Sequence, residues 1–170
     1  SLGTDPPNSP IQIEAPERPT FVIIGTIEGR KNHLLLLNIW SRLIDQLGDQ
    51  APRLLIIGQR GWEAEQVFDQ LDRSDALRSH VVELNDCSEE ELARHLASAC
   101  ALLFPSKVEG FGLPLVEALS LGVPVIASDL PVFREIGGDE IGEEVHDDRD
   151  QFFRFEEGSG QVDIDDNTYD

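Results

Sequence analysis

The chain has 170 residues, of which 40% are hydrophobic, and this suits one domain with a buried core. A formal net charge of −20 speaks against nucleic acid and anionic membrane surfaces as partners, because both would repel so acidic a protein. No apolar run approaches the roughly 20 residues that a membrane span needs, and the N-terminus lacks the layout of a signal peptide.

Residues 1–20 are expected to form a Pro-rich linker or a cloning remnant. Five of the ten prolines lie within Pro6–Pro19, among polar neighbours. The sequence contains no methionine, which indicates that it begins inside a longer gene product or after processing. We therefore expect an excised domain that follows another domain in the intact protein.

Residues 21–138 are expected to form one domain in which short apolar strands alternate with helices. The predicted strands are Phe21–Ile27, Arg53–Ile57, His80–Leu84, Cys100–Phe104 and Pro124–Ala127; the predicted helices are His33–Leu47, Trp62–Leu77, Glu89–Ser98 and Gly112–Leu121. Asn32 and Ser88 are the expected N-caps, and Ser88 forms a capping box with Glu91. The pattern predicts an α/β fold with a parallel sheet between two helical layers, which is a Rossmann-like arrangement.

Cysteine, tryptophan and histidine often take part in catalysis or binding, but in this sequence they are expected to have structural roles. Cys100 is expected to be a free, buried thiol at the start of a core strand, which favours a reducing, cytoplasmic setting. Trp40 and Trp62 are expected in the core. The histidines are expected at element ends or in solvent, and no pair of them has zinc-ligand spacing; they are His33, His80, His95 and His146.

Residues 139–170 form an acidic C-terminal segment, expected to be partly docked or disordered. From residue 138 onward the chain has 13 acidic and 2 basic residues. Gln151–Phe155 is predicted to form a last strand or a docked segment, because its three phenylalanines are too apolar to be exposed. Gln161–Asp170 is expected to be frayed. The carboxylates do not have the spacing of a calcium-binding EF-hand, so a solvated charge run is the favoured interpretation.

The stretch Pro105–Glu117 (PSKVEGFGLPLVE) carries the strongest functional pattern. An apolar strand is followed by a glycine-containing loop and then by a helix with Pro114 in its first turn. Such a junction presents backbone N–H groups and the positive end of a helix dipole to an anion. Glu109 and Glu117 flank it, and carboxylates accept hydrogen bonds from sugar hydroxyls. An anion site between two hydroxyl acceptors suits a nucleotide-sugar.

A second candidate loop follows the first strand and contains Arg30 and Lys31. Because the carboxyl ends of parallel strands share one edge of a sheet, we expect this loop on the same edge as Glu109. One or two cations there would neutralise a leaving diphosphate without a metal. Gly25–Gly29 lacks the third glycine of the dinucleotide-binding pattern, and the chain contains no P-loop.

Glu109 and Glu117, with seven residues between them, resemble the Glu-x7-Glu motif of retaining glycosyltransferases of the two-Rossmann-domain (GT-B) type. The run Ala118–Gly138 and the GTIEGRKN loop also resemble the group 1 glycosyltransferases, which form family four. The resemblance covers residues 21–138 and implies the C-terminal, donor-binding half of a GT-B fold. It implies a catalytic role for Glu109, and it implies neither a cofactor nor a metal. The residues that it implies contact the donor are Gly25, Thr26, Arg30, Lys31, Phe111, Gly112, Leu113 and Glu117.

The function implied by this resemblance is hexosyl transfer from a nucleotide-diphosphate sugar, such as GDP-mannose, to a polysaccharide or glycolipid acceptor. The implied setting is bacterial lipopolysaccharide synthesis, with the intact protein in the cytoplasm or at the periphery of the inner membrane. The acceptor site would belong to a missing N-terminal domain, so the isolated domain is expected to be inactive. Two alternatives stay open, namely a GT-B sugar-nucleotide epimerase and a non-catalytic nucleotide-sugar-binding module.

Overall fold

The computed structural model describes residues 18–110, 112–128, 152–155, 162–164 and 167–169. Several expectations therefore lie outside the described residues. They concern most of the Pro-rich linker, the part of the family-like run beyond residue 128, His146 and Phe111.

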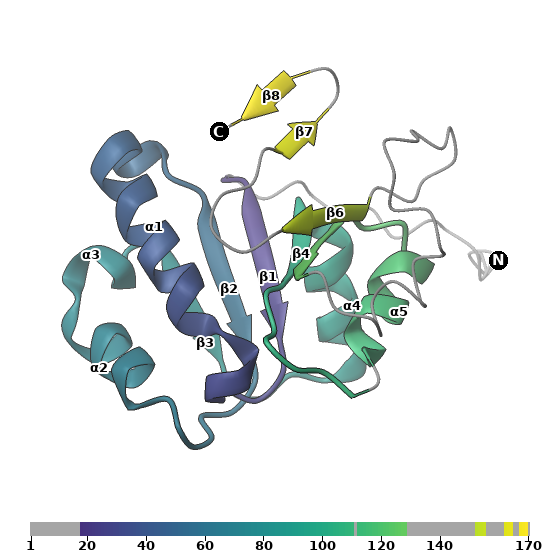
Figure 1. Cartoon of the computed structure of the whole chain (residues 1–170), viewed down its shortest axis with the longest axis horizontal. Coiled ribbons are helices and arrows are strands. Elements are labelled where there is room, and N and C mark those ends of the chain that lie inside the picture. The colour runs from purple at the N-terminus through teal and green to yellow at the C-terminus, as the bar shows by residue number, and fades with distance from the viewer. Residues whose placement is uncertain (1–17, 111, 129–151, 156–161, 165–166, 170) are drawn as a thin grey trace, which may run out of the picture.

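Six parallel strands form one sheet: β1 (Thr20–Ile24), β2 (Arg53–Ile57), β3 (Val81–Leu84), β4 (Ala101–Phe104), β5 (Val125–Ser128) and β6 (Phe152–Phe155). Their spatial order is β3-β2-β1-β4-β5-β6 (Figure 1). Every residue of β4 is buried, as expected for a strand with a helical layer on each face. This strand order is that of a Rossmann-like fold, in which connections run outward in both directions from the centre.

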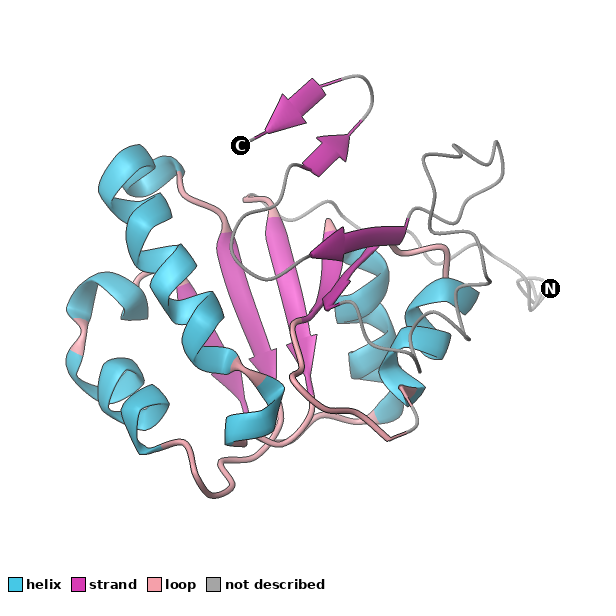
Figure 2. Ribbon diagram, in the orientation of Figure 1, coloured by secondary structure: helices cyan, strands magenta, loops and turns pink. Residues whose placement is uncertain are grey.

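The helices divide between the two faces of the sheet (Figure 2). They are α1 (His33–Leu47), α2 (Glu65–Arg73), α3 (Asp75–Arg78), α4 (Glu89–Ser98) and α5 (Leu113–Ser120), with short 3-10 turns η1 (Gly29–Lys31) and η2 (Gly48–Gln50). Leu37 and Trp40 of α1 pack with Leu54 and Ile56 of β2 in one core cluster. A second cluster joins α4 and α5 to the other face. The predicted three-layer α/β architecture is confirmed.

Two helical predictions are confirmed in detail, and one is wrong. Helix α1 has the expected bounds, and the Ser88–Glu91 capping box is present at the start of α4. The predicted helix Trp62–Leu77 is instead two helices, α2 and α3, which are separated at Ser74. The Ser74 side chain accepts a hydrogen bond from the Leu77 N–H and so caps α3. A serine side chain that hydrogen-bonds to the nearby backbone competes with the backbone hydrogen bonds of a helix, and this favours a break at Ser74.

Two burial predictions are also wrong. Trp62 precedes α2 and is 69% exposed, so it is not in the core. Cys100 is exposed and lies just before β4, and both cysteines are free. His80 lies at an element end, as expected, directly before β3; it is buried, and its carbonyl accepts from Leu54 N–H. Trp40 is buried as predicted, with its indole N–H donating to the Pro52 carbonyl at 2.8 Å.

The described parts of the acidic C-terminal segment are strands. Strand β6 pairs in parallel with β5, from Val125↔Phe152 to Ser128↔Phe155, which confirms the predicted last strand. Strands β7 (Val162–Ile164) and β8 (Asn167–Tyr169) form an antiparallel pair, where a frayed end was expected. In the part of the chain that the structure describes, no helix is long and apolar enough to cross a bilayer.

Candidate functional site

The candidate site lies at the carboxyl ends of β1 and β4, which are neighbours in the sheet although their crossovers run in opposite directions. This is the topological switch point where α/β sheets bind ligands. The loops that leave the two strands are joined by hydrogen bonds. Lys107 N–H donates to the Arg30 carbonyl at 2.8 Å, and Asn32 Nδ2 donates to the Pro105 carbonyl at 3.2 Å.

An ion pair connects the two loops at the side-chain level. Lys31 Nζ lies 2.8 Å from Glu109 Oε2, and each side chain is only 10% exposed. Ser106, which is 1% exposed, places its hydroxyl 3.4 Å from the same carboxylate oxygen. The Lys31 ammonium also lies 5.3 Å from the centre of the Phe104 ring, within the range of a cation–π contact. The structure thus brings together Lys31 and Glu109, which the sequence predicted to lie on one edge.

Gly25 lies against the Lys31 side chain. Its φ of +127° is a conformation that L side chains rarely adopt, and a β-carbon there would lie 3.4 Å from Lys31 Cε. The loop after β2 packs tightly against Thr26, since a β-carbon at Gly61 would lie 2.7 Å from Thr26 Cγ2. Gly25 and Thr26 therefore lie in a tightly packed stretch of chain beside Lys31.

Arg30 lies at the rim of the site. It is 46% exposed, donates to the Glu28 carboxylate at 2.8 Å, and approaches Glu109 Oε2 to 3.8 Å. The hydrogen bond to Glu28 raises the pKa of Arg30 above its ordinary value. Arg30 and Lys31 therefore present two positive charges beside one site carboxylate, and Arg30 remains open to a solvent-borne anion.

His33 lies directly behind this loop, at the first position of α1. It is 2% exposed, and neither ring nitrogen has a hydrogen-bond partner among the described residues. Burial, with a further contribution from the nearby Lys31 charge, lowers the pKa of His33 from 6.5 to about 4. His33 is thus a neutral, buried residue at neutral pH and adds no charge to the site.

Helix α5 begins four residues after Glu109, in the connection that leaves β4. Gly112 adopts a left-handed conformation (φ 61°), and its carbonyl accepts from Leu115 N–H at 3.0 Å. Leu113 is the first helical residue and is 71% exposed, and Pro114 follows in the first turn as predicted. Glu117 is exposed on α5, and its carboxylate has no hydrogen bond or ion pair within the described ranges. Unlike Glu109, it is not brought into contact with the cations.

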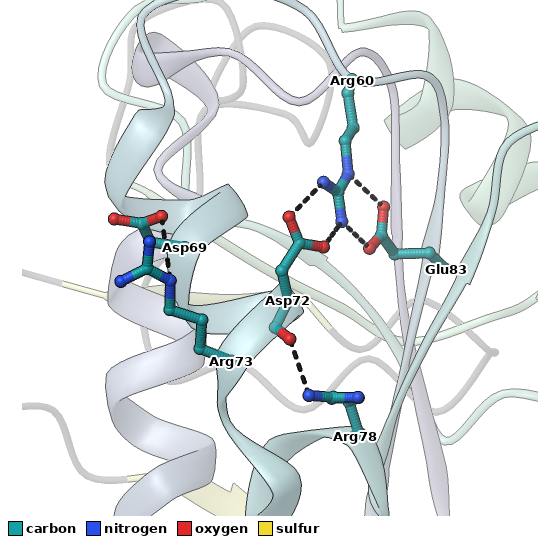
Figure 3. Close-up of polar contacts among 6 residues, drawn as sticks. All are labelled: Arg60, Asp69, Asp72, Arg73, Arg78 and Glu83. Atoms are coloured by element: carbon teal, nitrogen blue, oxygen red, sulfur yellow. Dashed lines mark hydrogen bonds and ion pairs between the residues drawn. The ribbon is translucent and has the colours of Figure 1, made fainter.

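The loop after β2 is anchored by a charged network that the sequence did not reveal (Figure 3). Arg60 donates two hydrogen bonds to Asp72 of α2 at 2.9 and 2.7 Å, and two to Glu83 of β3 at 3.1 and 2.7 Å. These bonds raise the pKa of Arg60 and lower that of Asp72. A bidentate guanidinium fixes geometry as well as charge, so this network holds the loop that packs against Thr26.

Sequence reasoning missed Ser106, Glu28 and the true role of Asn32. Asn32 is the N-cap residue of α1, as predicted, but its backbone is left-handed (φ 63°) and its side chain makes no capping hydrogen bond. The available signal was positional: all three are polar residues that follow a buried strand. The structure describes no group of three or more histidine, cysteine or carboxylate side chains that could hold a metal ion, within the ranges given above.

Comparison with known proteins gives a consistent result. The family model described as "Glycosyl transferases group 1" matches residues 6–150. The serotype-specific mannosyltransferase WbdA of Escherichia coli is 39% identical over 118 residues, which are 69% of this chain and 14% of that protein. The O-antigen chain mannosyltransferase RfbU of Salmonella typhimurium is 45% identical over 119 residues, covering 68% of this chain and 31% of that protein. The chain thus spans a minor part of these relatives.

Solved structures show the same fold at low sequence identity. The C-terminal domain of a group 1 glycosyl transferase from Francisella tularensis superposes with a TM-score of 0.61 at 18% identity, covering 80% of this chain and 67% of that one. The Anabaena protein HepE in complex with UDP-glucose gives 0.59 at 17% identity, covering 70% and 32%. These similarities confirm the predicted Rossmann-like α/β fold.

Proposed function

This chain belongs to the group 1 glycosyltransferases, and from that membership we propose that it is the donor-binding domain of a retaining hexosyltransferase. Its substrate would be a nucleotide-diphosphate sugar, and GDP-mannose is our first candidate because the relatives WbdA and RfbU are mannosyltransferases. Structural relatives solved with UDP-glucose or UDP support a nucleotide ligand for this fold.

The observation that carries the proposal is the meeting of Lys31, Arg30 and Glu109 beside the start of α5. The two cations and the positive end of the helix dipole would bind the diphosphate, whose charge grows as the bond to the sugar breaks. This assignment requires no metal. Glu109 would then lie next to the sugar, where a carboxylate can accept hydroxyl hydrogen bonds and stabilise a developing positive charge.

Glu117 is proposed to bind the ribose hydroxyls. Its carboxylate is exposed and lies one helical turn beyond the first residue of α5, so it can bind a ligand without first breaking an internal contact. The backbone N–H groups at Gly112 and Leu113 would complete the phosphate site, because the first N–H groups of a helix have no partner within the helix. Phe111, Gly25 and Thr26 remain proposed donor contacts.

For the whole protein we propose transfer to a saccharide or lipid-linked acceptor held by an N-terminal domain, at the cytoplasmic face of a membrane. The isolated domain would then bind donor without catalysing transfer, because the acceptor site and the closing cleft belong to the partner domain. The relatives named for O-antigen chain synthesis support a polysaccharide as the product.

The test is titration of GDP, UDP and dTDP, with and without their sugars, into 15N-labelled chain. We expect saturable shifts of the Gly112 and Glu117 amides with one nucleotide. Glu117→Gln should weaken that binding by about tenfold or more, the usual cost of losing charged hydrogen bonds. Glu90→Gln, an equivalent change at an exposed residue of α4, is the matched control and should bind like wild type. Absence of binding for all three nucleotides at millimolar concentration would contradict the proposal.

A further inference from the structure

Asn32 joins the two loops of the candidate site from an unusual backbone position. Its φ of 63° and ψ of 37° lie in the left-handed region, which asparagine tolerates better than most residues. In this conformation its side chain leaves α1 uncapped and crosses to the other loop, where Nδ2 donates to the Pro105 carbonyl at 3.2 Å. The two residues are 73 positions apart in the chain.

The acceptor of this hydrogen bond is the first residue after β4. Pro105 has no backbone N–H, so its carbonyl is the only main-chain group that can hold the chain at this point. Ser106 follows directly, and its hydroxyl approaches Glu109 Oε2. Fixing the Pro105 carbonyl therefore fixes the origin of the short segment that carries Glu109.

Asn32 is also the neighbour of Lys31, the partner of Glu109 across the loops. The contacts between the loops thus form a short ladder: Lys107 N–H to the Arg30 carbonyl, Lys31 to Glu109, and Asn32 to Pro105. The Lys107–Arg30 and Asn32–Pro105 contacts each include a backbone carbonyl, and they lie on either side of the ion pair. The Asn32 and Lys107 bonds join uncharged groups, so neither competes for an anionic ligand as the Lys31–Glu109 pair would.

We propose that Asn32 is a positioning residue that holds the Glu109 loop in register with Lys31 and so presets the donor site. This inference rests on the proposed function, because its expected consequence is a change in donor affinity. Asn32 does not touch the reacting groups; it acts through Pro105 on the segment that leads to Glu109. The backbone conformation and the amide donor are separate requirements, and asparagine satisfies both.

The decisive variant is Asn32→Gly, which keeps the left-handed backbone favourable but removes the donor. Asn32→Asp is the second variant, since a carboxylate of the same shape cannot donate to a carbonyl. Asn38→Asp, at an exposed position of α1, controls for the added charge. Hydrogen exchange of the Lys107 amide reports on the loops without any ligand, and the Leu55 amide in central strand β2 reports on the whole fold.

We expect Asn32→Gly and Asn32→Asp to speed exchange of the Lys107 amide by about three- to tenfold, the worth of one hydrogen bond. Exchange at Leu55 should stay unchanged, and the dissociation constant for the nucleotide that wild type binds should rise by a similar factor. Unchanged Lys107 exchange overturns the proposal, and so does faster exchange with unchanged nucleotide affinity. If wild type binds none of the three nucleotides, the proposed function fails, while the exchange result still decides whether Asn32 holds the loops together.

Discussion

The ammonium of Lys31 lies 2.8 Å from a carboxylate oxygen of Glu109, although the two residues are 78 positions apart. Both side chains are almost fully buried, so neither charge is solvated as it would be on the surface. Before any ligand arrives, each charge is therefore balanced by the other. A diphosphate that bound here would share Lys31 with Glu109, so occupation of the proposed phosphate site would be linked to the freedom of the carboxylate.

Lys31→Met should lower the free energy of unfolding by about 2 kcal/mol, because Glu109 would lose its closest charged partner while staying largely buried. Glu109→Gln should have an effect of the same sign. The double variant should cost less than the sum of the two, since neither charge is then left alone. Urea unfolding gives the free energy of unfolding of wild type, the two single variants and the double variant. Arg94→Met, which breaks the exposed pair with Glu90, is the control and should change stability by less than about 0.5 kcal/mol. Strictly additive effects would contradict the coupling.

Acid should destabilise the protein through His33. Its pKa is lowered to about 4 in the folded chain, from an ordinary value of 6.5, so the unfolded state binds the proton more readily. The contribution to stability is complete above pH 6.5 and is lost as the pH falls toward 4, by up to about 3 kcal/mol. Urea unfolding at pH 7 and at pH 4 should show a larger loss for wild type than for His33→Gln. Equal losses in the two proteins would show that His33 does not titrate in this way.

Arg60→Lys should lower the melting temperature by a few degrees, although the charge is conserved. An ammonium cannot make the four hydrogen bonds that the planar guanidinium makes with Asp72 and Glu83. Arg73→Lys is the matched control, because Arg73 is 80% exposed and makes a single 3.7 Å contact with Asp69 (Figure 3). Thermal unfolding of the two variants compares them directly. A smaller loss for Arg60→Lys than for Arg73→Lys would show that the network does not hold the loop.

Gly58→Ala should destabilise the fold by at least about 3 kcal/mol, since it combines backbone strain with a steric clash. Gly58 has a φ of +154°, and a β-carbon there would overlap the carbonyl group of Gly25 at the candidate site. Gly110→Ala is the control, because a β-carbon at Gly110 meets nothing within 4 Å. Denaturant unfolding gives both values. Near-equal stabilities of the two variants would contradict the close approach of the loops after β1 and β2.

The alternation of apolar strands and amphipathic helices was enough to predict the fold class. Helix α1 could be bounded correctly because its apolar residues repeat at helical spacing and Gly48 ends it. The Ser88–Glu91 capping box is likewise a local pattern, since each residue satisfies the backbone of the other. Local signals failed at Trp62, where helical spacing continued through a segment that forms a loop.

The sequence also determined which edge of the sheet carries the candidate site, because parallel strands all end on the same edge. It proposed Lys31, Glu109 and Glu117 as site residues by type and position. Only the tertiary structure decided that Lys31 pairs with Glu109 while Glu117 stays exposed. That choice depends on β1 and β4 being neighbours, and strand order arises from long-range packing that no local pattern encodes. For the same reason the bond from Asn32 to Pro105 could not be read from residues that lie 73 positions apart.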